Sequence, residues 1–301
     1  MNAIEIRNLN KSFSKKQAVR DLNMTVPVGA IYGFIGENGS GKSTTEKMIC
    51  GLLIPSGGQL KLFGKDFTDA EIRKQMGCLI EAPGCFPNYS VWNNLMLQAA
   101  NLNIKNPEKE IRKVLKMVRM EGAASNKYKN CSLGMKQRIG IAMALLGNPK
   151  LLVLDEPING LDADGMRIMR EVLVDLAENH QCTILISSHI LGELEKIATH
   201  YGIIRGGKMI KEMTAKELDA DCRTYVALQV KEPNRAKALL ERKYFRVEED
   251  ESGNLRVYDA KNSEEIVTYL YEKGILISEI QTAKIGLEEY YMDLMNQKEG
   301  R

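Results

Sequence analysis

A glycine-rich stretch near the start of the chain has residue types and spacing suited to binding phosphate. Residues 36–44 read Gly-Glu-Asn-Gly-Ser-Gly-Lys-Ser-Thr and fit the pattern G-x-x-x-x-G-K-[ST]. Backbone N–H groups of such a loop can surround phosphate oxygens, and the following helix adds its positive dipole end. Lys42 is expected to reach the β and γ phosphates, and Ser43 to ligate Mg²⁺. The candidate ATP-binding residues here are Gly36, Asn38, Gly39, Ser40, Gly41, Lys42, Ser43 and Thr44.

Two adjacent carboxylates later in the chain could complete a hydrolytic site. Asp155 and Glu156 directly follow the apolar run Leu151–Leu154. If that run is a strand of an open α/β sheet, its carboxyl end is where ligands bind. Asp155 is then placed to hold the hydration shell of Mg²⁺, and Glu156 to orient and polarise the attacking water. A strand that ends in solvated acids is the alternative, and the phosphate loop earlier in the chain argues against it.

The flanking residues predict the strands and helices that these motifs need. Ala30–Ile35 is a short apolar strand before the loop, and Lys42–Leu53 has an amphipathic helical pattern after it. Thr183–Ser187, like the run before Asp155, is expected to be a parallel strand covered on both faces. Half-buried strands are predicted at Ile4–Leu9 and Leu22–Val26, and amphipathic helices at residues 107–120 and 165–178. Strands that alternate with helices indicate an α/β fold.

Composition narrows the class of protein. The 301 residues include 42 basic and 39 acidic side chains, a net charge of +3, which gives no indication that nucleic acid is a partner. No apolar run approaches the roughly 20 residues needed to cross a bilayer, and no leader is recognised, so a membrane role requires a second polypeptide. The cysteines form no CxxC pair, which fits a reducing compartment and argues against a zinc site or disulfide framework. They are Cys50, Cys78, Cys85, Cys131, Cys182 and Cys222.

Residues 131–138, which read Cys-Ser-Leu-Gly-Met-Lys-Gln-Arg, indicate a family. The stretch resembles the signature motif of ABC transporter ATP-binding subunits, Leu-Ser-Gly-Gly-Gln, and differs from it at three of the five core positions. The variant is similar to the form found in drug- and bacteriocin-type exporters. Ser132 still offers a hydroxyl, and Gly134 still permits close backbone approach at the start of a helix, so an anion site is expected there.

The resemblance, which covers residues 2 to about 215, implies further site residues. Asp162 lies in a stretch that looks like the family's D-loop, His189 looks like the switch histidine, and Phe13 sits where an adenine-stacking aromatic is placed. A core residue at a strand end is the alternative for Phe13. The family usually has Gln at the position of Glu81, and glutamate there resembles the variant loop of bacitracin-resistance and lantibiotic-immunity transporters. The implied catalytic residues are therefore Glu156, His189 and Glu81.

Two acidic residues near the motifs have less obvious roles. Glu81 can still ligate Mg²⁺ or its water but adds negative charge, so it is expected to tune hydrolysis and coupling and not to abolish them. The implied metal ligands are Ser43, Glu81 and Asp155. Glu46, one turn after the phosphate loop, is expected at the surface or just outside the residues that contact the ligand.

The resemblance also implies an architecture. Residues 1–218 are expected to form a P-loop NTPase cassette of the ABC type, with a RecA-like core, an antiparallel β subdomain and a helical subdomain at about 82–150. Residues 222–301 predict a small α+β domain whose order β-α-β-β-α-β would be ferredoxin-like. Its expected strands and helices are Tyr225–Val230, Asn234–Lys243, Phe245–Glu249, Leu255–Asp259, Ser263–Glu272, Ile275–Ile280 and a last helix at Leu287–Met295, with a turn at Ser252–Asn254.

The resemblance also implies which partners the subunit works with. The subunit is expected to form a head-to-tail homodimer with two sandwiched ATP molecules, in which Ser132 and Gly134 come from the opposite protomer. A separate transmembrane permease is expected to contact the loop near residues 81–92, with the subunit at the cytoplasmic face of the membrane. Export of an antimicrobial peptide or drug, for self-protection, is the expected function. The alternatives are a non-transport ABC ATPase of DNA repair, chromosome structure or translation, and an inactive regulatory cassette, which Glu156 and His189 argue against.

Overall fold

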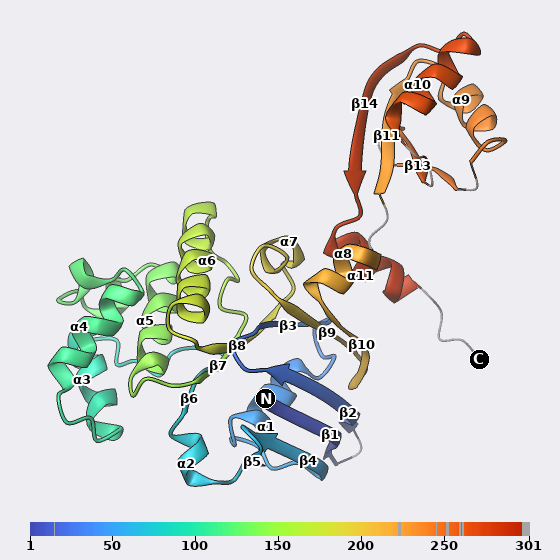
Figure 1. Cartoon of the computed structure of the whole chain (residues 1–301). Helices are drawn as coiled ribbons and strands as arrows, with labels where there is room; N and C mark the ends of the chain where they lie inside the picture. Colours follow the sequence, from blue (N-terminus) through green and yellow to red (C-terminus); the bar gives the residue numbers. More distant parts are fainter. Residues whose placement is uncertain are drawn as a thin grey trace. The chain divides into compact units, whose positions relative to one another are not determined.

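The computed structural model describes residues 1–14, 16–221, 224–244, 246–250, 253–258, 260 and 262–296 (Figure 1). The chain divides into two compact units, Met1–Ala215 and Lys216–Arg301. The sequence predicted the junction slightly later, between residues 218 and 222. Each unit has its own apolar core.

A six-stranded sheet forms the centre of the first unit, with strand order β10-β9-β3-β8-β7-β6. The pairs β3–β8, β3–β9, β7–β8 and β6–β7 are parallel, while β10 is antiparallel to β9. All residues of β3, β7 and β8 are buried, which explains their continuous apolar sequences. The strands are β3 (Ile31–Ile35), β6 (Met76–Leu79), β7 (Leu151–Asp155), β8 (Thr183–Ser188), β9 (His200–Arg205) and β10 (Lys208–Thr214).

A second, antiparallel sheet has the order β2-β1-β4-β5. Its inward residues share one apolar cluster with the central sheet and with the helix after the phosphate loop; Leu22, Phe34 and Met48 are members from the three elements. The predicted strands at 4–9 and 22–26 lie within longer ones. The strands are β1 (Asn2–Phe13), β2 (Lys16–Pro27), β4 (Gly57–Leu62) and β5 (Lys65–Asp66).

Helices α3, α4 and α5 pack on one another and form the green region of Figure 1, within the predicted helical subdomain. The helix after the phosphate loop is shorter than predicted: it ends at Ile49 and not at Leu53, because Gly51 takes a left-handed φ of 69°. The helices are α1 (Lys42–Ile49), α2 (Ala70–Arg73), α3 (Val91–Asn101), α4 (Pro107–Met117), α5 (Leu133–Leu145), α6 (Ala163–Glu178) and α7 (Leu191–Leu194), with 3₁₀ turns at Glu121–Ala123 and Tyr128–Asn130.

The second unit contains an antiparallel sheet of order β12-β13-β11-β14, whose core includes Leu228, Leu240 and Ile266. The predicted positions Cys222, Phe245, Ser252 and Asp259 lie outside the described residues. The name ferredoxin-like stays a prediction. The elements are α8 (Ala215–Asp221), β11 (Thr224–Val230), α9 (Pro233–Leu240), β12 (Val247–Glu249), β13 (Leu255–Tyr258), α10 (Ser263–Glu272), β14 (Ile277–Lys284) and α11 (Leu287–Asn296).

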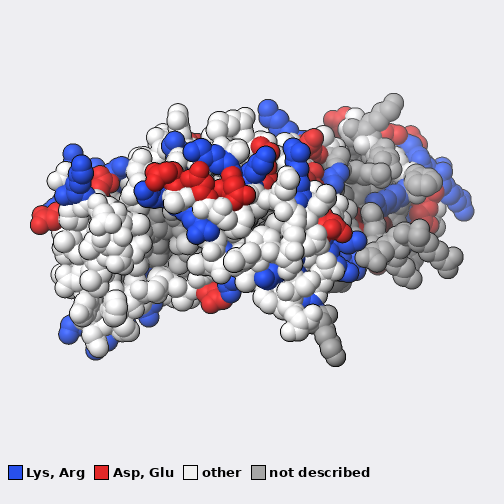
Figure 2. All heavy atoms as spheres, turned by 90° about the horizontal axis from the view of Figure 1, so that it is seen from below, with Lys and Arg blue, Asp and Glu red and all other residues white. Residues whose placement is uncertain are grey.

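Charge and hydropathy add two observations about the described residues. Within the ranges given above, the chain contains no helix that is both long and apolar enough to cross a membrane. On the face shown in Figure 2, acidic side chains gather in a cluster bordered by basic ones. Opposite charges thus lie next to one another on this face, which agrees with the nearly balanced composition.

Candidate nucleotide-binding site

The phosphate loop joins the carboxyl end of β3 to the start of α1, as the motif requires. Gly41 caps the helix with a φ of 111°, and a Cβ on it would lie 2.8 Å from the carbonyl oxygen of Ala18. A Cβ on Gly36 would lie 2.5 Å from the carbonyl oxygen of Ile204. Backbone conformation at Gly41, and close packing at both positions, therefore require glycine.

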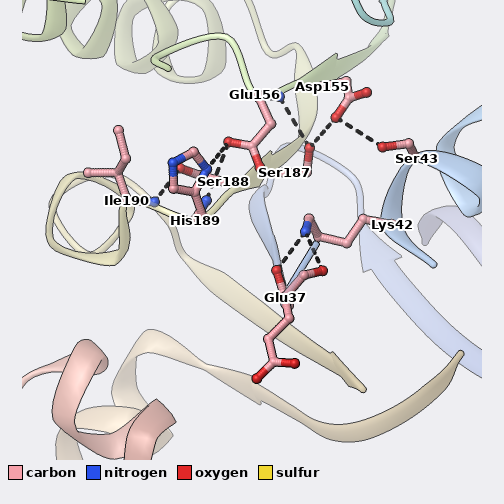
Figure 3. Close-up of polar contacts among 10 residues, drawn as sticks. Glu37, Lys42, Ser43, Asp155, Glu156, Ser187, Ser188, His189 and Ile190 are labelled. Carbon is pink, nitrogen blue, oxygen red and sulfur yellow. Dashed lines mark hydrogen bonds and ion pairs between the residues drawn. The ribbon is translucent and has the colours of Figure 1, made fainter. Parts of the chain in front are cut away.

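Lys42, the first residue of α1, is only 6% exposed. Its Nζ donates hydrogen bonds to the carbonyl oxygens of Gly36 at 2.6 Å and Glu37 at 3.2 Å (Figure 3). The ammonium is thus held against the same loop whose N–H groups are expected to bind phosphate. A buried, positioned cation at this place suits the binding of β and γ phosphates.

Asp155 lies at the end of β7, close to Ser43 on α1. The hydroxyl of Ser43 donates to Asp155 Oδ1 at 3.4 Å, and the hydroxyl of Ser187 donates to the same atom at 3.0 Å. Ser187 is the residue of β8 that pairs with Asp155 in the parallel register. The structure therefore brings together the two predicted ligands Ser43 and Asp155 from different elements, and adds Ser187, which the sequence analysis treated only as part of a strand.

Glu156 and His189 form the closest contact between the predicted catalytic residues. His189 Nδ1 lies 2.7 Å from Glu156 Oε2, and the His189 backbone N–H donates to the same oxygen at 3.4 Å (Figure 3). Glu156 has a left-handed φ of 50°, and its N–H donates to the carbonyl and hydroxyl oxygens of Ser187, both at 3.2 Å. A left-handed conformation costs a non-glycine residue about 1–3 kcal/mol. Here it accompanies the turn that directs the carboxylate toward His189.

Glu81 follows β6 and also has a left-handed φ, of 64°. Its carboxylate oxygen Oε1 lies 2.7 Å from Nζ of Lys47 on α1. This hydrogen bond and the positive charge of Lys47 lower the pKa of Glu81 below its usual value. Glu81 is therefore ionised at neutral pH and is held at the end of α1 by a solvent-exposed ion pair.

These residues face a cavity of about 700 Å³. Six of the predicted site residues are outside its lining, although His189 contacts the lining residue Glu156. The six are Gly36, Ser40, Ser132, Gly134, Asp162 and His189. Lys16 and Ala18 of β2 line it without having been singled out, because no local motif marks them, while Asn159 and Gly160 belong to the stretch that resembles the D-loop. The lining residues are Phe13, Lys16, Ala18, Asn38, Gly39, Gly41, Lys42, Ser43, Thr44, Glu81, Leu133, Gln137, Asp155, Glu156, Asn159 and Gly160.

Phe13 lies at the end of β1 and is 46% exposed, so it is not part of the core. Nζ of Lys11 lies 5.1 Å from the centre of its ring. An exposed aromatic face in the cavity lining is available for stacking on a base.

Ser132, Gly134 and Asp162 lie at helix starts. The Ser132 hydroxyl caps α5 and accepts from the Met135 N–H at 3.3 Å, while Asp162 caps α6 and accepts from the Gly165 N–H at 2.9 Å. In the part of the chain that the structure describes, none of the three lines the cavity. The neighbouring Leu133 and Gln137 do line it. The capping roles explain why these residue types begin these two helices.

Glu46 was given two possible places, at the surface or just outside the residues that contact the ligand. It is 0% exposed, so the structure excludes the first of the two. Its pKa is raised well above the usual value, first by burial and then by the charge of Asp155. The spacing gave a usable signal, because residues four apart share one helix face and Glu46 follows the buried Lys42 by four.

Comparison with known proteins agrees with this geometry. Residues 19–159 match the ABC transporter family. The chain is 38% identical to the bacitracin transport ATP-binding protein BcrA of Bacillus licheniformis, over 97% of each chain. It is 39% identical to the lantibiotic transport ATP-binding protein SrtF of Streptococcus pyogenes, over 72% of this chain and 91% of that protein.

A solved structure gives the same result for the fold. CbiO1 of Clostridium perfringens, part of the ABC transporter complex cbiONQ, superimposes with a TM-score of 0.66 and 27% identity, covering 73% of this chain and 91% of that one. Together with the phosphate loop, the carboxylates of Asp155 and Glu156 and the adjoining His189, these matches show that the chain belongs to the ABC transporter family as an ATP-binding, ATP-hydrolysing subunit.

Proposed function

We propose that this subunit drives the export of antimicrobial peptides through a separate membrane permease and so protects the cell that makes it. The full-length similarity to a bacitracin transport protein carries this proposal, and the lantibiotic transport relative supports it. Glu81 also supports the proposal, because glutamate at this position resembles the loop of bacitracin-resistance and lantibiotic-immunity transporters. Subunits of this family work with permease subunits encoded as separate chains.

Mg²⁺ fits the oxygen donors at the site. Ser43 and Asp155 are already within hydrogen-bond distance of one another, and Glu81 lines the same cavity. Hydroxyl and carboxylate oxygens are the donors that this hard cation prefers. When bound with ATP, the ion would neutralise charge on the phosphate oxygens. Ser43 and Asp155 are the residues that would hold it, with Glu81 placed to bind the ion or one of its waters.

The protein's own residues account for the remaining steps of hydrolysis. The Lys42 ammonium can transfer its hydrogen bonds from the loop carbonyls to phosphate oxygens. The Glu156 carboxylate can accept a proton from the attacking water, and its hydrogen bond to His189 fixes the direction of the carboxylate. Phe13 offers its exposed ring to the adenine. No step in this scheme requires a covalent intermediate.

A homodimer is proposed because one chain does not place the two matching signature residues, Ser132 and Gly134, in the lining of its own cavity. Ser132 and Gly134 lie at the start of α5, where backbone N–H groups and the helix dipole favour an anion. Within the described residues, both lie outside the cavity lining. In a head-to-tail pair they would meet the γ phosphate held by the partner, and Asp162 would lie at the same interface. ATP would then join the two subunits, and its hydrolysis would release them.

The segment after Glu81 has exposed aromatic side chains suited to a protein interface. Phe86 is 58% exposed and Tyr89 is 48% exposed, with their ring centres 5.4 Å apart. Trp92 is half-buried, and its ring is covered by the guanidinium of Arg112 at 5.2 Å. Exposed aromatics are enriched at interaction hot spots. We therefore place the permease contact at residues 81–92, which puts the subunit at the cytoplasmic face of the membrane.

Deletion of the gene tests the transport function. The deletion strain is expected to grow less well than the wild type in bacitracin or a lantibiotic, and expression of the wild-type chain is expected to restore growth. A chain carrying Glu156→Gln should not restore it, because it lacks the base that hydrolysis requires. Equal growth of deletion and wild-type strains across a panel of peptide antibiotics would contradict the proposed substrate class while leaving the ATPase assignment intact.

Replacing Glu81 by Gln tests its tuning role. The amide keeps the shape of the side chain but loses the charge that pairs with Lys47. Because Glu81 is not the base, we expect the ATPase rate to change by less than about tenfold, below the usual effect of losing a general base. Steady-state ATP hydrolysis of the purified chain measures this. A loss as large as that of Glu156→Gln would instead make Glu81 essential to the chemistry.

A further inference from the structure

Arg119 is a residue at which three helices of the first unit are joined. It lies just after the end of α4 and has a left-handed φ of 55°, a conformation that is unfavourable for a non-glycine residue. Its backbone carbonyl oxygen accepts a hydrogen bond from Nη1 of Arg138 on α5 at 3.1 Å. Its own Nη1 donates to Oε2 of Glu171 on α6 at 2.5 Å. Backbone and side chain of one residue therefore connect α4 to both neighbouring helices.

Glu171 is held in place by a second guanidinium, which belongs to its own helix. Its Oε1 lies 2.8 Å from Nη1 of Arg167, and Nη2 of Arg167 lies 2.7 Å from Oδ1 of Asp164 in the first turn of α6. One carboxylate oxygen of Glu171 is thus bound within α6, and the other is bound by Arg119. Because Arg167 limits the directions in which Glu171 can point, Arg119 meets an acceptor that is already oriented.

The ion pair spans an opening between two helices. A cavity of about 810 Å³ lies beside it, lined by residues of α4 such as Lys116 and residues of α6 such as Asp175, together with Arg119 and Glu171 themselves. The two paired side chains are 51% and 41% exposed. Water thus reaches the space between α4 and α6 here, and the Arg119–Glu171 pair is a direct contact that fixes their separation.

The start of α5 contacts the residues that precede α6. A Cβ on Gly160 would lie 2.8 Å from Cδ2 of Leu133, and a Cβ on Gly134 would lie 3.5 Å from Cδ2 of Leu161. Arg138 lies further along α5, so this helix is held at two separate points. Two such points fix the direction of a helix, and the direction of α5 determines how its capping residue is placed relative to the capping residue of α6.

We propose that Arg119 is a positioning residue that holds α5 against α6 through Arg138 and Glu171, and so places Ser132 and Asp162 together for the ATP of the partner subunit. The inference rests on the proposed head-to-tail homodimer. When only a fraction of the molecules has the arrangement that binds, the apparent affinity falls by that fraction. Arg119 raises this fraction without touching the nucleotide. An exposed ion pair changes an equilibrium by up to about fivefold, which sets the size of the expected effect.

ATP-driven dimerisation of the full chain tests the inference. The variants are made in a chain that carries Glu156→Gln, so that hydrolysis does not remove the dimer, and the dimer is measured by analytical ultracentrifugation with Mg²⁺ present. The ATP concentration that gives half-maximal dimer is expected to rise about two- to fivefold in Arg119→Gln and in Glu171→Gln. Combining both changes should have no larger effect than either alone, because each removes the same ion pair.

Nucleotide binding by the monomer is the readout that should not move. Among the described residues, neither Arg119 nor Glu171 lines the nucleotide cavity, so the affinity for ADP, measured by calorimetry, is expected to stay at the wild-type value. A general loss of folding would lower this affinity as well. A change confined to dimerisation therefore indicates positioning.

Three further variants separate positioning from stability. Arg119→Gly removes the ion pair, but glycine adopts a left-handed φ without strain, so the Tm should stay near the wild-type value while dimerisation still needs more ATP. Arg119→Lys keeps a positive charge within reach of Glu171 and should restore dimerisation toward the unmodified background. Lys196→Gln is the matched control: Lys196 lines the same cavity, but its ion pair, with Glu193 at 2.7 Å, joins residues only three positions apart.

The outcomes separate this inference from the proposed homodimer. If Arg119→Gln, Arg119→Gly and Glu171→Gln dimerise at the same ATP concentration as the Glu156→Gln chain alone, the inference is overturned and the homodimer stands. An equal rise in Lys196→Gln would also overturn it, because the effect would then be a general one. Failure of the Glu156→Gln chain to dimerise with ATP at all would contradict the homodimer itself.

Discussion

Replacement of Glu156 by Gln is expected to lower the ATPase rate by about 10²- to 10⁴-fold, the range for loss of a general base. The amide keeps the size of the side chain and can still hydrogen-bond to His189, which lies 2.7 Å away in the wild type. It cannot accept the proton of the attacking water. Lys42, Ser43 and Asp155 are unchanged, so ATP binding is expected to persist. The variant should therefore hold ATP without hydrolysing it and accumulate as a dimer.

Steady-state hydrolysis and size-exclusion chromatography of the same samples check both parts. The wild type should hydrolyse ATP and remain mostly monomeric, while Glu156→Gln should elute as a dimer only when ATP is added. Glu37→Gln removes an acid of the phosphate loop outside the catalytic contacts and should behave as the wild type. Hydrolysis by Glu156→Gln at the wild-type rate would place the base elsewhere. If the wild type is also inactive, the assay is repeated with the permease.

The sequence predicted the site best where a short local motif contains the residue types that the chemistry requires. The phosphate loop and the carboxylates after β7 are local patterns, and the buried strands that position them are continuous apolar runs, so both could be recognised without the fold. His189 was assigned because of the family resemblance, and the structure brings it to Glu156. In each of these predictions, a short stretch of chain contains both the functional residue and the neighbouring residues that identify it.

The parts that the sequence missed depend on contacts between distant segments. Lys16 and Ala18 line the cavity because β2 passes the phosphate loop, and nothing local to them indicates it. The ion pair between Lys47 and Glu81 joins α1 to the end of β6. Glu46 was expected either at the surface or just outside the ligand contacts, and its complete burial depends on the packing of α1 against distant strands such as β7. A motif identifies residues that contact a ligand, but it does not identify the distant residues that pack behind them.

Replacement of Lys42 by Met should weaken ATP binding by about 10- to 150-fold, which corresponds to the roughly 1.5–3 kcal/mol of a hydrogen bond to a charged group. The methionine fills similar space but offers no donor to the phosphates. It also removes the positive charge that lowers the pKa of the buried Glu46, so the variant is expected to unfold at a lower temperature than the wild type. Nucleotide titration by calorimetry and thermal unfolding measure the two effects.

A double variant separates the effect of Lys42→Met on ATP affinity from its effect on the stability of the fold. In a chain that already carries Glu46→Leu, Lys42→Met should cost less stability, because no buried carboxyl remains to be stranded, while the loss of ATP affinity should be unchanged. Lys47→Met removes a positive charge from the same helix outside the phosphate loop and should leave ATP affinity near that of the wild type. If Lys42→Met lowers the Tm equally with and without Glu46, the two side chains do not interact, and the stability loss arises from the loop carbonyls of Gly36 and Glu37 that Lys42 no longer satisfies.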